Sequence, residues 1–179
     1  MPQRTPRKLE AEALWEYALR ALAAHARSLG ELRQKLLGRA RRLEDVPAVL
    51  VRLKQAGLLD DRRFAEEYSA NRLENQGLGQ DRVLRDLRRR RVAPKLAEEA
   101  VKAVYRDTDE VSLIEQFLRR KYRHTPLEAF LAEPKNLAAA YRRLRAAGFA
   151  PANILGVLGR FSADAAWLSS PEEPAESEE

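Results

Sequence analysis

The stretch LRRRRVAP at residues 87–94 has a counterpart at residues 144–151, which read LRAAGFAP. In both stretches an apolar residue, Val92 or Phe149, stands directly before Ala-Pro. Proline is tolerated in the first turn of a helix, and a glycine such as Gly148 favours the end of the helix before it. Both stretches therefore predict the same local structure, in which one helix ends, the chain turns inward and a second helix begins.

A weaker similarity recurs at a spacing of 51 residues, where Tyr17 aligns with Tyr68 and Leu36 with Leu87. Apolar residues follow a helical period over nearly the whole chain. Units this small cannot bury their apolar faces alone, so we expect neighbouring units to pack in a row. We predict an all-α fold, an elongated body of three tandem three-helix repeats. The alternative is one compact bundle in which the similarity is accidental.

The predicted repeats occupy residues 9–59, 60–107 and 108–163, and the third carries an insertion that starts near Thr125. Within the first repeat, Ser28 and Glu31 have the spacing of a capping box at a helix start. Gly57 is placed to end a helix. The two carboxylates that follow it, Asp60 and Asp61, are placed to accept hydrogen bonds at the start of the next helix.

Charge divides the chain unevenly. Residues 164–179 contain six acidic side chains and neither Lys nor Arg, and we predict that this acidic tail is disordered. Residues 1–163 therefore carry 33 Lys and Arg against 21 Asp and Glu. A body with this excess of positive charge attracts polyanions through counterion release, although the same charge can simply aid solubility.

Several classes of protein are disfavoured. Cysteine is absent, the two histidines are far apart, and no glycine-rich phosphate loop or nucleophile elbow occurs, so we predict no metal, no cofactor and no enzyme activity. A nuclease that uses Asp60, Asp61 and Glu66 is the alternative from the enzyme class. No signal peptide and no apolar run of bilayer length is found, which predicts a soluble cytoplasmic protein.

Residues 50–65 read LVRLKQAGLLDDRRFA, and this run resembles the signature of the RecX family, regulators of the bacterial RecA recombinase. The sequence YALR at residues 17–20 and the segment 28–37 support the resemblance, as does the basic helix that follows Gly-Leu-Gly at residues 77–79. The resemblance covers roughly residues 10–160. One departure is Arg91, because the family often has glycine at that position.

The resemblance implies a curved array of three-helix repeats that lies in the groove of the RecA–DNA filament. Members of the family interfere with ATP hydrolysis by RecA, with strand exchange and with filament growth, and some also contact DNA. The implied partner is the RecA filament, with single- or double-stranded DNA as a further one, and we expect a monomer. The alternative function is that of a sequence-independent nucleic-acid-binding protein.

The basic helix from Arg82 to Arg91 is the best candidate for a binding surface. Arg82, Arg85 and Arg89 recur at positions i, i+3 and i+7, which predicts one cationic stripe that faces away from the apolar residues of the helix. Two further basic clusters follow, and ordinary solvated surface charge is the alternative reading of all three. The candidate RecA- or DNA-binding residues are Arg82, Arg85, Arg88, Arg89, Arg90, Arg119, Arg120, Lys121, Arg142 and Arg143.

Overall fold

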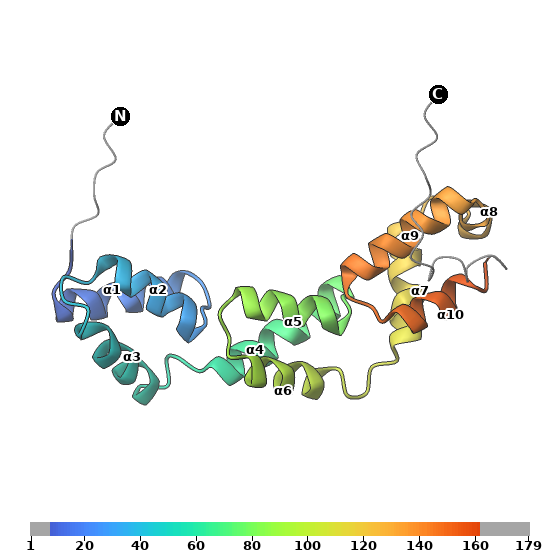
Figure 1. Cartoon of the computed structure of the whole chain (residues 1–179). Coiled ribbons are helices and arrows are strands. Elements are labelled where there is room, and N and C mark those ends of the chain that lie inside the picture. Colours follow the sequence, from blue (N-terminus) through green and yellow to red (C-terminus); the bar gives the residue numbers. More distant parts are fainter. Residues whose placement is uncertain (1–7, 162–179) are drawn as a thin grey trace, which may run out of the picture. The chain divides into compact units, whose positions relative to one another are not determined.

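The computed structural model describes residues 8–161, and the tail predicted at residues 164–179 lies outside this range. All secondary-structure elements of the described residues are helices, apart from one isolated bridge between Leu9 and Ala40 (Figure 1). The prediction of an all-α fold is therefore confirmed. The helices are α1 (Ala11–Ala24), α2 (Leu29–Arg39), α3 (Asp45–Gln55), α4 (Asp61–Asn71), the π-helical turn η1 (Arg72–Gln76), α5 (Gln80–Arg89), α6 (Pro94–Val104), α7 (Glu110–Lys121), α8 (Leu127–Ala132), α9 (Pro134–Ala147) and α10 (Pro151–Leu158).

The helices belong to two compact units, and the boundary between them crosses α5. The first unit comprises the chain up to Asn71 together with Leu84–Val104, and the second comprises Arg72–Val83 together with the chain from Tyr105 onward. Helices α1 to α3, α4 to α6 and α7 to α10 fall within the three repeat limits taken from the sequence. The boundaries of the two units do not coincide with those of the three predicted repeats. The repeat limits therefore stay a prediction.

In the first unit, α1, α2 and α3 pack around a core of aliphatic side chains. The core follows from sequence, because each helix presents its apolar residues at helical spacing to the other two. Ser28 and Glu31 form the predicted capping box, and Gly57 adopts the left-handed conformation with φ of 67°. The buried residues of this core are Leu14, Ala18, Leu32, Leu36, Ala40, Val46, Val49, Leu50, Leu53 and Leu59.

The start of α2 also contacts the end of α5 within the first unit. The Ser28 hydroxyl donates a hydrogen bond to the Arg90 carbonyl. A Cβ atom on Gly30 would lie only 2.5 Å from both the Cβ and the carbonyl oxygen of Arg91, so only glycine allows this approach. The hydroxyl at the start of α2 thus satisfies a carbonyl at the end of α5, and the meeting of a helix start with a helix end is also favourable for the two helix dipoles.

The second unit contains the same kind of contact between the start of α5 and the end of α9. The Gly79 N–H donates to the Ala147 carbonyl at 2.9 Å, and the Asp81 N–H donates to the Gly148 carbonyl at 3.2 Å. A Cβ atom on Gly79 would lie 2.2 Å from the Gly148 oxygen. Ser28 and Gly79, which make equivalent contacts, are 51 residues apart, so the weaker of the two sequence similarities has a structural counterpart.

The 57-residue similarity corresponds to two helix ends of identical form. Arg91 and Gly148 both adopt left-handed conformations, with φ of 58° and 91°. The next residue is buried in each case, and its N–H donates back to a leucine carbonyl, from Val92 to Leu87 at 3.1 Å and from Phe149 to Leu144 at 3.3 Å. This geometry is that of a Schellman motif, which confirms the predicted pair of helix ends.

Replacing Gly30 by alanine tests the close contact between α2 and α5. Because the new methyl group would overlap Arg91, we expect Gly30→Ala to lower the free energy of unfolding by about 1–3 kcal/mol. The control is Gly38→Ala, since a Cβ at this exposed position of α2 meets no atom within 4 Å. Alanine there should raise stability by about 0.5–1 kcal/mol. Urea denaturation measures both, and equal effects would contradict the contact.

Replacing Arg91 by glycine tests the strain at the end of α5. A left-handed conformation is costly for a residue with a Cβ atom, so Arg91→Gly should raise the free energy of unfolding by about 0.5–1 kcal/mol. The matched change Arg89→Gly lies in the last helical turn and should instead lower it by about 1 kcal/mol. A destabilised Arg91→Gly variant would show that the Arg91 side chain contributes more than its backbone costs.

Candidate anion-binding surfaces

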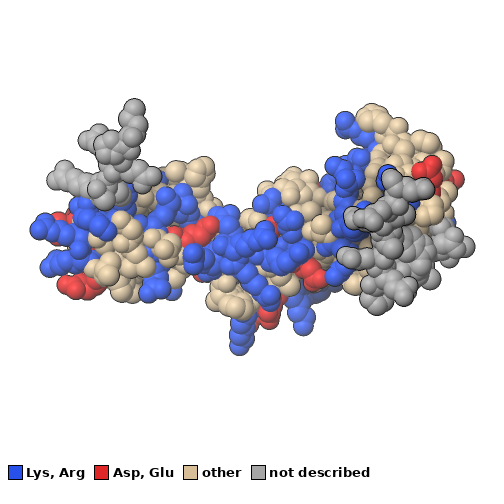
Figure 2. All heavy atoms as spheres, turned by 45° about the horizontal axis from the view of Figure 1, so that its top comes forward, with Lys and Arg blue, Asp and Glu red and all other residues tan. Residues whose placement is uncertain are grey.

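Buried apolar residues and exposed basic residues of helix α5 recur at helical spacing on different sides of the helix. Val83 and Leu87 are fully buried, whereas Arg85, Arg88 and Arg89 are exposed. The three exposed arginines belong to the part of α5 that lies in the first unit. Two residues of the predicted cationic stripe, Arg85 and Arg89, are therefore exposed together with the further candidate Arg88. Figure 2 shows basic side chains more widely spread than acidic ones on the face it presents.

Two acidic side chains near these arginines differ in exposure, because Glu98 is exposed whereas Asp86 is nearly buried. The Arg88 guanidinium lies 3.2 Å from the Glu98 carboxylate, and that of Arg89 lies 3.9 Å from the Asp86 carboxylate. An ion pair between two exposed side chains, such as Arg88 with Glu98, contributes about 0–1 kcal/mol, because water screens it and both side chains lose entropy. An external phosphate or carboxylate can replace Glu98 as the partner of Arg88 at little cost.

Arg82 differs from the other residues of the predicted stripe. It is half-buried in the second unit, where its Nη1 atom lies 3.5 Å from the Ala146 carbonyl at the end of α9. The backbone of Arg82 also approaches Gly148 closely, since a Cβ on that glycine would lie 2.2 Å from the Arg82 nitrogen. Arg82 therefore packs against the end of α9 in addition to carrying a charge.

Arg90 follows α5 and fills the junction between α2 and α4. Its guanidinium pairs with both carboxylate oxygens of Glu31 and donates to the Ala26 carbonyl at 3.0 Å. The same group lies 5.0 Å from the centre of the Phe64 ring and 5.6 Å from that of Tyr68. A bidentate carboxylate and two aromatic rings are the partners that suit a planar guanidinium, so Arg90 holds the first unit together.

Replacing Arg90 by glutamine tests whether this arginine stabilises the first unit or only adds to the surface charge. Arg90→Gln removes the cationic partner of Glu31, and we expect a loss of about 2 kcal/mol in the free energy of unfolding. The control Arg89→Gln removes the same charge from a side chain that is 76% exposed, and it should change stability by less than about 0.5 kcal/mol. Thermal or urea denaturation distinguishes the two, and a neutral Arg90→Gln would refute the assignment.

In the second unit, the basic residues at the end of α7 meet those of α9 around Tyr122. The Arg143 Nη1 atom donates to the Tyr122 hydroxyl at 2.9 Å, and its guanidinium lies 5.7 Å from the ring centre. Arg120 donates to the Gln76 carbonyl and lies beside the Phe117 ring. Arg119, Lys121 and Arg142 are exposed, and Arg119 lies 3.8 Å from Glu115. The contact between Arg143 and Tyr122 therefore brings one residue of the cluster on α9 next to the end of α7.

Sequence reasoning treated all these cations alike and missed the aromatic residues beside them. The position of Arg90 directly after the helix, four residues before Pro94, is the only available signal that it turns toward a neighbouring repeat. Tyr122 gave no signal, because its contact with Arg143 depends on how α7 and α9 pack.

Asp60 and Asp61, two of the three carboxylates considered for a nuclease, have structural roles. One oxygen of Asp60 accepts hydrogen bonds from the N–H groups of Arg62 and Arg63 at the start of α4, as predicted. Asp61 instead accepts from the Leu29 N–H at 2.6 Å, and burial raises the pKa of this carboxyl against the lowering effects of that bond and of Lys54. Within residues 8–161, no three His, Asp or Glu side chains gather to hold a metal ion.

No helix in residues 8–161 has the length and apolar character needed to cross a membrane.

Three-helix groups with exposed arginines define the class of this molecule as an all-α repeat protein. A solved structure described as RecX from Lactobacillus salivarius is similar to it, with a TM-score of 0.66 and 19% identity over 84% of this chain and 96% of that one. A family model, the second three-helix domain of RecX, matches residues 60–101. The fold is thus that of RecX structures, which confirms the three-helix-repeat prediction.

Curated relatives named "Regulatory protein RecX" show the family. The protein of Mycolicibacterium smegmatis is 34% identical over 143 residues, which cover 78% of this chain and 71% of that protein. The protein of Halorhodospira halophila is 40% identical over 90 residues, which cover 50% of this chain and 55% of that protein. The chain belongs to the RecX family of regulatory proteins. It spans only 51–65% of the length of several of these relatives.

Proposed function

We propose that this protein binds the RecA–DNA filament and restrains it, so that ATP hydrolysis, strand exchange and filament growth slow down. The observation that carries the proposal is the exposed face of α5, where Arg85, Arg88 and Arg89 stand in a chain of the RecX family. Arginine binds carboxylates and phosphates through paired hydrogen bonds, and a filament of protein on DNA offers both groups.

A repeat protein can restrain a filament without performing a reaction. If it contacts neighbouring protomers in one conformation of the filament, it stabilises that conformation by its difference in affinity between states. Turnover of ATP requires the filament to leave that conformation, and turnover therefore slows. The proposal needs no cofactor and no catalytic residue, and it assigns the protein to the cytoplasm as a monomer.

A second candidate function is sequence-independent binding of nucleic acid. It is favoured by Lys121 and Arg142, which are exposed in the second unit close in sequence to Tyr122 and Arg143. Cations beside an aromatic ring suit phosphates and bases. Salt separates the two candidates, because affinity built on many phosphate contacts falls steeply with ionic strength, whereas a protein contact with apolar parts falls less.

The test replaces Arg85, Arg88 and Arg89 by glutamate. Because the substitutions reverse the charge on the exposed side of α5 and leave its buried side intact, helical content should stay unchanged. The concentration needed for half-inhibition of RecA ATPase on single-stranded DNA should rise at least about tenfold, as loss of two or three charge-assisted bonds implies. Circular dichroism and the ATPase assay, repeated at several salt concentrations, measure these effects.

The matched control replaces Arg20, Arg33 and Lys35, three exposed cations of α1 and α2, by glutamate. It changes the net charge by the same amount at other positions of the first unit. Equal losses in both triple variants would mean that net charge alone matters, and undiminished inhibition by the α5 variant would rule out the role of this face.

A further inference from the structure

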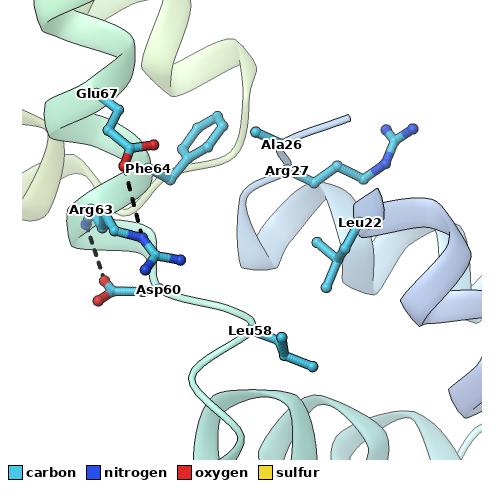
Figure 3. A pocket seen from close by; sticks show the side chains of 8 residues that line it. All are labelled: Leu22, Ala26, Arg27, Leu58, Asp60, Arg63, Phe64 and Glu67. Atoms are coloured by element: carbon cyan, nitrogen blue, oxygen red, sulfur yellow. Dashed lines mark hydrogen bonds and ion pairs between the residues drawn. The ribbon is translucent and has the colours of Figure 1, made fainter. Parts of the chain in front are cut away.

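A hollow of about 210 Å³ lies in the first unit between the end of α1 and the start of α4 (Figure 3). Leu22, Leu58 and Phe64 contribute to its apolar wall. Two basic and two acidic side chains also line it, so its charges favour neither an acidic nor a basic partner. An apolar surface with a more definite charge pattern lies on α3, the helix that precedes Leu58.

The large hydrophobic side chains that are exposed within residues 8–161 are all found on α3 and in its two flanking turns. They are Leu43, which is 62% exposed, Val51 at 52% and Leu58 at 46%. Between the first two, Pro47 and Ala48 are exposed as well. Exposed hydrophobic residues that are scattered singly need no explanation, whereas a group of them on one helix indicates a contact surface.

The exposed residues of α3 form one face. Since successive residues of an α-helix are rotated by about 100°, Pro47, Ala48 and Val51 point within about 100° of one another. The acidic residue Glu44 and the basic residue Lys54 stand at the two ends of this face, and both are exposed. Glu44 belongs to the face because its backbone already has helical angles, with φ of −64° and ψ of −20°. The opposite side of α3 is buried through Val46, Val49, Leu50 and Leu53.

A helix face with an acidic start and a basic end is complementary to itself when two copies lie antiparallel. A two-fold axis at the level of residue 49 places Glu44 opposite Lys54 and Pro47 opposite Val51, because both pairs of positions are centred on 49. The small side chain of Ala48 lies next to this axis, where two helices approach most closely. A parallel arrangement would instead bring like charges together.

We propose that a second copy of this chain packs against the outer face of α3 through this antiparallel contact. One helix face per chain offers less than the roughly 1,200–2,000 Å² that stable complexes bury, so the dissociation constant should be on the order of 0.1 mM. At micromolar concentration the chain is then the monomer that the proposed function requires. The face is separate from the arginines of α5, and the pairing does not rest on that function.

The test is sedimentation equilibrium of the full chain between about 10 µM and 1 mM. The chain should be mainly monomeric at the lower concentration and mainly dimeric at the higher one. Nothing larger than a dimer should form, because a two-fold contact uses the same face of both copies and is closed.

A serine at position 51 removes the apolar centre of the face. Val51→Ser should weaken the pairing at least about tenfold, because the substitution acts twice across the two-fold axis. The matched control is Leu58→Ser, which alters a similarly exposed side chain in the linker after α3 (Figure 3). This control should leave the dissociation constant unchanged, and circular dichroism checks that both variants keep their helices.

Two charge variants test the antiparallel register. Glu44→Lys places two lysines opposite each other and Lys54→Glu places two glutamates opposite each other, so each variant alone should pair at least about fivefold more weakly. An equimolar mixture of the two variants again places opposite charges together at both contacts. The mixture should therefore pair as tightly as the unaltered chain.

Four results would overturn the proposal: a monomer at about 1 mM, species larger than a dimer, equal effects of Val51→Ser and Leu58→Ser, or a mixture of the charge variants that pairs no better than its components. None of these measurements contains RecA, so failure here and failure of the proposed regulatory function are told apart. Conversely, an unchanged ATPase inhibition by the α5 variant does not bear on the pairing.

Discussion

The structure depends on contacts in which the start of one helix meets the end of another from the next group of three. In the first unit Gly30 lies against Arg91, and in the second Gly79 lies against Gly148. Both contacts need glycine, because any Cβ atom would overlap the opposing backbone. They satisfy N–H and carbonyl groups that helix ends otherwise leave to water, so small three-helix groups that could not fold alone support one another.

These contacts decide which basic residues are available to a partner. Arg90 stands at the junction in the first unit, and its charge is used by Glu31 and by two aromatic rings. Arg88 and Arg89 lie one turn or less before it and are exposed. A run of arginines that looks uniform in sequence is therefore divided into one residue that builds the fold and others that remain on the surface.

Two kinds of surface result from this arrangement in the first unit. The exposed side of α5 is almost purely cationic and suits repeated anionic groups, for which exact shape matters little. The hollow beside Leu58 has an apolar wall and is also lined by two basic and two acidic side chains, Arg27, Arg63, Asp60 and Glu67.

The sequence by itself determined the helices, their caps and the similarity between successive groups, because these follow from local periodicity, from Ser28 and Glu31, and from glycine at helix ends. Residues 50–65 also pointed to the family. The role of Arg90, the meeting of Arg143 with Tyr122, and the hollow beside Leu58 were decided only by tertiary structure. Each joins residues more than 20 positions apart, and periodicity says which side of a helix is buried but not which neighbour covers it.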